Sequence, residues 1–195
     1  MRKAMLKRKT KETNISIDLN LDGRGSYSIN TSIPFLDHML SLMCKHGLFD
    51  IKLKAKGDID IDDHHTVEDI GIVIGKALKQ AVGDMKGIAR YGQASVPMDE
   101  ALASVSIDIS GRPYFVYKVE FPKKNKLKDF DPDLIEDFLQ AFVSSSSITL
   151  HINALYGRNI HHIIEAVFKG LGRALREAVS VNRKIKSIPT TKGLI

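Results

Sequence analysis

The first half of the chain alternates between hydrophobic patterns typical of strands and of helices. Apolar and polar residues alternate over residues 14–30, NISIDLNLDGRGSYSIN, on both sides of Asp-Gly-Arg-Gly, which predicts a β-hairpin. The segment FDIKLKA, residues 49–55, predicts a further strand. Apolar residues at three- and four-residue spacing predict helices over 32–47 and 65–84. The predicted order is therefore strand, strand, helix, strand, helix.

The second half repeats this order. Its predicted elements are a hairpin formed by 103–110 and 114–121 around Gly-Arg-Pro, a helix over 131–145, a strand over 148–155 and a helix over 161–179. We therefore expect one α+β domain, residues 1–195, made of a duplicated ββαβα unit, with repeats at approximately 9–84 and 93–183. The region 83–92 is predicted to link the two halves.

The histidines carry the same duplication. His64 and His161 lie 97 residues apart, and each opens a His-His-x-x-Glu sequence at the start of a predicted helix. Upstream, LDHML aligns with EDFLQ, which sets His38 opposite Asp137 at a separation of 99 residues. The two-residue difference falls in the loop before the histidine pair. A chance match would not preserve the order of the elements as well, so these positions indicate an internal repeat.

Composition narrows the class of protein. The chain is 43% hydrophobic and 27% charged, as in ordinary globular proteins, and no apolar run approaches the roughly 18 residues that span a bilayer. Residues 1–13 are basic but contain no apolar signal core, and we interpret them as a solvated strand edge. The single cysteine, Cys44, forms no internal disulfide and is expected to pack as a small hydrophobe. A cytoplasmic location is expected.

The net charge of +6 is compatible with nucleic acid or with a small anion as the ligand. Five Tyr, eight Phe and no Trp show no interleaving with basic residues of the kind that stacks bases. A small anionic substrate is therefore favoured, with no nucleic-acid or membrane partner.

The two His-His-x-x-Glu clusters predict metal binding. Adjacent histidines on a helix diverge by about 100°, so they cannot easily bind one ion together. Two metal ions are therefore predicted, each taking one histidine from each repeat. The internal symmetry suggests one ligand set of His64, Glu68, Asp137 and His162, and a second of His38, His65, His161 and Glu165. Imidazole and carboxylate donors exclude metals that require thiolates. His46 and His151 could equally be structural.

Several motifs resemble those of the imidazoleglycerol-phosphate dehydratase family. They are FLDHML, DDHHTVEDIGI, RYG, MDEAL, SGRP, GRNIHHIIEAVFK and IPTTKG, and the resemblance runs from about Lys9 to Gly193. It implies a fold like the second domain of ribosomal protein S5, with helices between two four-stranded sheets. It also implies dehydration of imidazole glycerol phosphate to imidazole acetol phosphate in histidine biosynthesis. The implied enzyme uses two manganese ions per site and forms 24-subunit homo-oligomers with active sites between subunits.

The resemblance also implies roles for individual residues. The manganese ligands would be His38, His64, His65, Glu68, His161, His162 and Glu165. The substrate contacts would be Glu12, Arg90, Arg112, Lys169, Thr190, Thr191 and Lys192. Two positions depart from the family pattern, because Asp137 replaces a histidine ligand and Thr190 replaces a serine. An aspartate can still donate oxygen to a hard cation, so Asp137 is expected to be a ligand with altered affinity or metal preference.

The implied reaction removes a hydroxyl and a C–H proton from a chain without a carbonyl, so the imidazole ring must accept the electrons. Two cations on the ring nitrogens would favour imidazolate, which can expel hydroxide through a diazafulvene-like intermediate. Proton transfer requires a carboxylate, with Glu12 as first choice and Glu68 or Glu165 as alternatives. Arg112 could instead be a turn residue, and Lys169 could merely pair with Glu165. A two-metal phosphoesterase and a metal-storing assembly remain rival functions.

Overall fold

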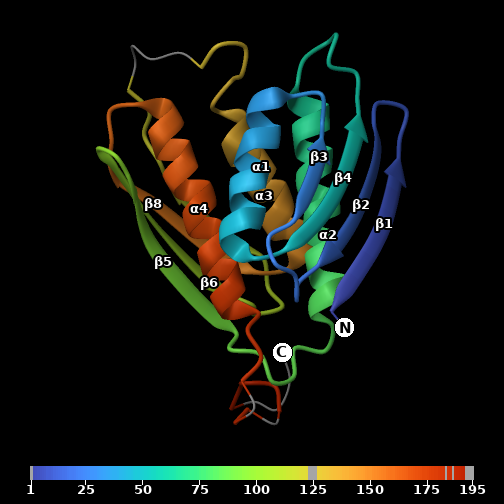
Figure 1. Cartoon of the computed structure of the whole chain (residues 1–195), viewed down its shortest axis with the longest axis vertical. Helices are drawn as coiled ribbons and strands as arrows, with labels where there is room; N and C mark the ends of the chain where they lie inside the picture. The colour runs from blue at the N-terminus through green and yellow to red at the C-terminus, as the bar shows by residue number, and fades with distance from the viewer. Residues whose placement is uncertain (1, 123–126, 183, 186, 192–195) are drawn as a thin grey trace.

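Four helices lie between two four-stranded sheets (Figure 1). This architecture, seen in a computed structural model that describes residues 2–122, 127–182, 184–185 and 187–191, confirms the expected α+β class. The first sheet has the order β1 (Lys3–Lys9), β2 (Asn14–Asn20), β4 (Asp50–Lys56), β3 (Tyr27–Asn30). The second has the order β5 (Tyr91–Met98), β6 (Ala101–Asp108), β8 (Thr149–Tyr156), β7 (Tyr114–Lys118). The two orders are equivalent, so the two halves repeat one topology.

The predicted hairpins over 14–30 and 103–121 are wrong. Strands β2 and β3 lie on opposite sides of β4, and β6 and β7 lie on opposite sides of β8. The last strand of each predicted hairpin instead runs parallel to the strand that follows the next helix. This is a β-α-β crossover, in which the intervening helix returns the chain to the end of the sheet where the first strand began, so that the next strand runs parallel to it.

Each half also begins with an additional strand. The basic N-terminal segment forms β1, an edge strand with alternating exposure, as its interpretation as a solvated strand edge predicted. In the second half, β5 starts inside the region expected to be a linker. The unit is therefore βββαβα rather than ββαβα.

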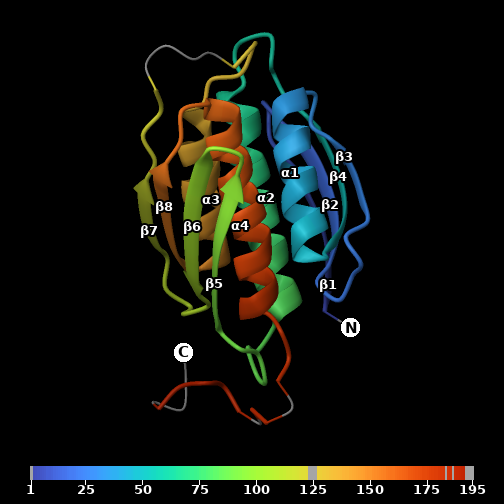
Figure 2. The same ribbon diagram turned by 60° about the vertical axis from the view of Figure 1, so that its left-hand side comes forward.

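The helices form two layers, each covering one sheet (Figure 2). Helices α1 (Pro34–Gly47) and α2 (His64–Val82) pack on the first sheet, and α3 (Leu134–Ser146) and α4 (Ile160–Ala178) pack on the second. Across the middle, α2 packs against α3 and α1 packs against α4. Within the described residues, no helix combines the length and apolar character that crossing a bilayer requires.

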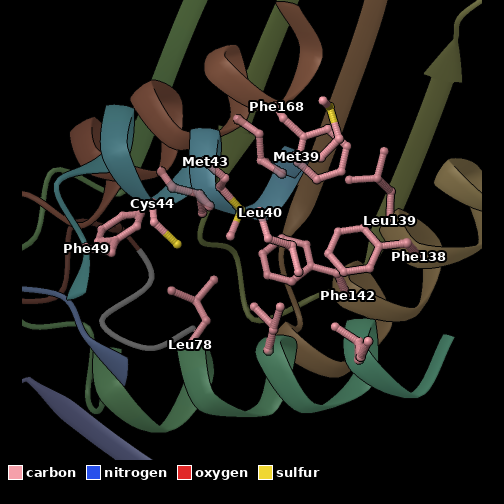
Figure 3. Packing of buried hydrophobic residues seen from close by; sticks show 14 of the residues in the cluster. Met39, Leu40, Met43, Cys44, Phe49, Leu78, Phe138, Leu139, Phe142 and Phe168 are labelled. Atoms are coloured by element: carbon pink, nitrogen blue, oxygen red, sulfur yellow. The ribbon is translucent and has the colours of Figure 1, made fainter. Parts of the chain in front are cut away.

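Large apolar side chains from all four helices meet between the layers (Figure 3). The Phe138 ring stacks on Phe142 and on Phe168, with centroid separations of 6.5 and 5.8 Å. Cys44 belongs to this core and is fully buried, as expected for a small hydrophobe. Burial raises the pKa of its thiol to about 12, so Cys44 stays a neutral thiol at physiological pH.

Two glycines allow the backbones of helices in the two layers to come into direct contact. A methyl group added at Gly75 of α2 would lie 2.5 Å from the carbonyl oxygen of Phe142 in α3. A methyl group at Gly172 of α4 would clash with the carbonyl oxygen of Met43 in α1. The two glycines are 97 residues apart and the two partners 99 apart, the same separations that relate His64 to His161 and His38 to Asp137. The repeat inferred from histidines therefore also governs helix packing.

The substitution Gly75→Ala should destabilise the protein because the added methyl group meets a backbone carbonyl that cannot move independently. We expect a loss of about 1–3 kcal/mol in the free energy of unfolding, as in other overpacked cores. Urea denaturation followed by circular dichroism measures this loss. Lys76→Ala, at the neighbouring exposed position of α2, is the control. An unfolding midpoint of Gly75→Ala equal to that of the control would contradict the close helix contact.

Candidate active site

The helix α1–α4 contact assembles a cluster of His38, His161 and Glu165. His161 Nε2 lies 3.1 Å and His38 Nε2 lies 3.6 Å from the same oxygen, Glu165 Oε2. Among the described residues, these three form the group of histidine, cysteine and acidic side chains whose ligand atoms all lie within 4.8 Å of one another. Two imidazole nitrogens and a carboxylate oxygen are donors that suit divalent manganese, iron or zinc.

Local structure at the start of α4 positions two members of this cluster. The Asn159 side chain accepts a hydrogen bond from the His161 backbone N–H at 2.9 Å and so caps the helix. Glu165 follows His161 by four residues and lies on the same helix face. The Phe35 ring meets the His161 ring edge to face at 5.4 Å. The cap therefore fixes the backbone at His161, and the aromatic contact packs against its imidazole.

Glu165 is the buried member, with 8% of its surface exposed. Burial alone would raise its pKa, but the hydrogen bonds and charges of Lys169 and His161 outweigh burial and hold the pKa below the ordinary value. Lys169 Nζ lies 2.5 Å from Glu165 Oε1 and also donates to Met98 Sδ. One carboxylate oxygen thus faces the lysine while the other faces the two histidines.

A cavity of about 520 Å³ adjoins the cluster. Its lining includes Phe35, His38 and His161, together with Lys128 and Phe130 from the segment before α3. The volume lies in the range typical of sites for small molecules. A ligand in this cavity would reach both histidines.

The α2–α3 contact forms the repeat-related counterpart. His64 Nδ1 lies 3.4 Å from Asp137 Oδ2, so Asp137 faces the first histidine of α2 as His38 faces the first histidine of α4. Both side chains are 46% exposed, and Glu68, one turn along α2, is also exposed. The structure therefore places Asp137 as the alignment with His38 predicted, although its role as a metal ligand stays a prediction.

The second histidine of each pair faces a different carboxylate. His65 Nδ1 lies 3.1 Å from Asp58 Oδ2, and His162 Nδ1 lies 2.7 Å from Glu100 Oε2. The Asp58 hydrogen bond, with a contribution from the charge of Glu12, raises the pKa of His65. The His162 hydrogen bond is the main cause that lowers the pKa of Glu100 to about 2. One chain thus brings together parts of each predicted ligand set, and the membership of His65 and His162 stays a prediction.

Glu12 lies in the turn between β1 and β2, near the start of α2. The Thr13 hydroxyl next to it donates to the buried Asp69 of α2, and Arg8 binds the other oxygen of Asp69 at 2.9 Å. Asp69 therefore holds both sides of the turn. The Glu12 side chain is exposed, as a group that meets a ligand must be.

The predicted substrate contacts Arg90, Arg112, Thr190 and Thr191 lie at the other end of the helices. Arg90 N donates to the carbonyl of Ala178, the last residue of α4, at 2.9 Å, whereas His161 is the second residue of that helix. At 1.5 Å per residue, this helix separates Arg90 from the histidine cluster by roughly 25 Å. Figure 1 shows the segment after α4 leaving at the end opposite the starts of the helices.

The Arg90 guanidinium binds within the chain. It donates to both Asp108 oxygens at 2.7 and 3.1 Å and to the Pro189 carbonyl at 2.8 Å. It therefore ties the segment carrying Thr190 and Thr191 to the end of β6. Arg112 is exposed in the turn between β6 and β7, and Lys192 lies outside the described residues.

Asp58, Glu100 and Asp69 are site residues that the sequence analysis missed. Asp58 and Asp69 flank the first histidine pair in the acidic run GDIDIDDHHTVED, and Glu100 belongs to MDEAL. These motifs were visible, but Glu100 is 62 residues from its histidine. No periodicity links such positions before the fold brings them together.

A mixed imidazole–carboxylate cluster beside a cavity is typical of a metal-dependent enzyme, and comparison with known proteins identifies the family. The model of the imidazoleglycerol-phosphate dehydratase family matches residues 31–175. Proteins of that name from Geobacter metallireducens and Clostridium botulinum are 57% and 58% identical over 192 residues, which cover 98% of this chain and 98% and 97% of theirs. The chain belongs to the imidazoleglycerol-phosphate dehydratase family and is an enzyme of the lyase class.

Solved structures agree with this assignment. Imidazoleglycerol-phosphate dehydratase from Staphylococcus aureus matches with a TM-score of 0.82 at 40% identity, covering 91% of this chain and 98% of that one. The Pyrococcus furiosus protein in complex with (S)-C348 matches with a TM-score of 0.85 at 37% identity, covering 97% and 100%. The similarity therefore extends to the whole arrangement of sheets and helices.

If the cluster holds a divalent cation, the substitution Glu165→Gln should weaken its binding, because it removes the charge from the carboxylate shared by His38 and His161. We expect the dissociation constant for Mn²⁺, measured by isothermal titration calorimetry, to rise roughly tenfold or more. Glu136→Gln, at an exposed position of α3, is the matched control and should bind as the wild type does. Equal affinity for the two variants would show that the cluster holds no ion.

Proposed function

We propose that this enzyme dehydrates D-erythro-imidazole glycerol phosphate to imidazole acetol phosphate in histidine biosynthesis, with two manganese ions per active site. The observation that carries the proposal is the cluster of His38, His161 and Glu165, found on the fold of this family. We place the enzyme in the cytoplasm, in keeping with its buried, unpaired Cys44.

The donor atoms present fit the proposed ions. His38, His161 and Glu165 would hold one ion, completed by His65, and His64, Glu68, Asp137 and His162 would hold the other. Two such ions would stabilise the imidazolate form of the substrate ring, from which hydroxide would leave through a diazafulvene-like intermediate.

Among the protein groups, Glu12 is best placed to move the proton. Its exposed carboxylate lies in a turn that Asp69 holds through Thr13 and Arg8. Its negative charge contributes to the raised pKa of His65. Glu165 is less suited to accept a proton, since Lys169 and His161 lower its pKa. Glu68, exposed on the first turns of α2, remains the alternative.

Phosphate recognition is assigned to Arg90, Arg112, Lys169 and the segment containing Thr190, Thr191 and Lys192. Arginine can bind phosphate through two parallel hydrogen bonds, and helix α4 keeps Arg90 roughly 25 Å from His161 within one chain. Arg90 of one copy can therefore meet the histidines only of another copy. This separation supports a homo-oligomer with active sites between subunits, for which we propose 24 subunits.

Incubation of the manganese-loaded enzyme with imidazole glycerol phosphate should yield imidazole acetol phosphate. The product is measured by its absorbance after alkali converts it to the enol. Phosphate release is measured in the same reactions. Free inorganic phosphate without the acetol product would point instead to a phosphoesterase. Manganese binding with neither product would indicate a metal-storing assembly. His161→Ala should lose the dehydration activity at least a hundredfold, since it removes a donor from the cluster.

Mixing two inactive variants tests whether the site is shared. His161→Ala and Arg90→Ala should each be inactive alone, because each removes one part of every site. After joint denaturation and refolding, mixed assemblies contain some sites with intact His161 from one subunit and intact Arg90 from another. We expect a partial return of activity in the mixture. Two variants refolded separately and then combined provide the control, and an inactive mixed assembly of normal size would contradict a site between subunits.

A further inference from the structure

The second histidine of each pair is held at Nδ1 by a carboxylate that has no role in the proposed reaction. Glu100 Oε2 lies 2.7 Å from His162 Nδ1, and Asp58 Oδ2 lies 3.1 Å from His65 Nδ1. Asp58 precedes its histidine by seven residues, whereas Glu100 precedes its histidine by 62. The two carboxylates are therefore not equivalent in the repeat. Carboxylates at two positions that the repeat does not relate make the same contact with a histidine. This indicates that the histidine requires the contact, and that the contact is not simply a copy of one duplicated loop.

Glu100 is itself fixed in place. It lies in the turn between β5 and β6, and its other oxygen, Oε1, accepts hydrogen bonds from the backbone N–H groups of Arg158 and Asn159 at 3.2 and 2.9 Å. These groups lead into α4, where His162 is in the first turn. The carboxylate thus joins the β5–β6 turn to the helix and points its remaining oxygen at the imidazole.

Asp58 has fewer partners. Its Oδ2 faces His65, while its Oδ1 is buried without a hydrogen-bond partner among the described residues. The only hydrogen bond of this carboxylate within that part of the chain is therefore to the histidine. Asp58 does not serve the structure as a helix cap, so its effect on His65 can be separated from an effect on folding.

These contacts determine which imidazole nitrogen is available. An aspartate or glutamate is ionised at neutral pH and accepts hydrogen bonds without donating. Nδ1 must therefore carry the proton, and in a neutral imidazole the lone pair is then on Nε2. His162 Nε2 lies toward the exposed Asp99, at 3.8 Å from Oδ2. The nitrogen that can bind a cation is thus on the outward side of the ring.

We propose that Glu100 and Asp58 are positioning residues that hold His162 and His65 in the tautomer with a free Nε2, and that they thereby set the metal affinity of these two ligands. This inference rests on the proposed metal-dependent function. Carboxylate partners of metal-binding histidines orient the ring and raise its basicity, and their loss typically weakens metal binding 10–100-fold. Glu100 should matter more, because its bond to the histidine is shorter and its position is fixed by two backbone groups.

The first measurement is the tautomer in the metal-free protein. Histidine labelled with ¹⁵N distinguishes a protonated Nδ1 from a protonated Nε2 by chemical shift in solid-state NMR of the sedimented protein. The signals of His162 and His65 are identified by their loss in His162→Asn and His65→Asn. We expect both to show protonated Nδ1 in the wild type, and Glu100→Ala and Asp58→Ala each to change only their own histidine toward protonated Nε2.

The second measurement is the dissociation constant for Mn²⁺ by calorimetry. Glu100→Ala and Asp58→Ala should each raise it roughly 10–100-fold. Lys79→Ala is the control for Glu100, because it removes a side-chain hydrogen bond to Ser147 near the far end of α2 and should change neither the His162 tautomer nor the affinity. Asp60→Ala, an exposed residue in the Asp58 loop, is the control for Asp58. If Glu100→Ala does not fold, Asp58→Ala alone decides.

The two hypotheses fail in different ways. Wild-type protein that binds no Mn²⁺ overturns the proposed function and the role of both carboxylates in metal affinity. Wild-type protein that binds Mn²⁺ and dehydrates the substrate, while both alanine variants keep the original tautomers and affinities, overturns the positioning role alone.

Discussion

Two close helix contacts support the candidate site. Where Gly75 meets Phe142 and Gly172 meets Met43, one helix lies directly against the backbone of another, which a larger side chain would prevent. This approach brings the starts of α1 and α4 together and the starts of α2 and α3 together. His38 can then share a carboxylate oxygen with His161, and Asp137 can face His64. The stacked rings of Phe138, Phe142 and Phe168 pack between these helices, so core packing and the geometry of the candidate site depend on the same two contacts.

Local sequence patterns predicted the features that are determined within a single segment of the chain. The four helices, the histidine repeat and the match between His38 and Asp137 follow from spacing along the chain. The structure forms these helices and sets Asp137 against His64, while the ligand roles stay predictions. Strand pairing depends on which edge the chain reaches after a helix, so β3 and β7 were assigned to hairpins that do not form. Strand β5 was missed because it begins in a region rich in glycine and charge and contains Pro97, a residue that is unusual within strands. Glu100 was missed because only folding brings it to His162.

Charge is divided between the two ends of the helices. The histidines and carboxylates lie around the helix starts, whereas Arg90 and the segment it binds lie beyond the end of α4. At the end with the histidines, partly buried Lys169 pairs with buried Glu165, which keeps the carboxylate ionised where burial alone would favour its protonated form. A substrate with an imidazole at one end and a phosphate at the other would match these two kinds of surface, provided that they come from different subunits.

Duplicated positions can diverge, and His38 and Asp137 have done so. One keeps a neutral nitrogen donor, while the other offers a charged oxygen donor facing His64. As metal ligands, these two equivalent positions would not prefer the same ion, because a carboxylate favours harder ions than an imidazole does. A centre built in this way would fill in order, with one position occupied at a lower cation concentration than the other. The fraction of enzyme with both positions occupied would then depend on the concentration of the ion that the weaker position prefers.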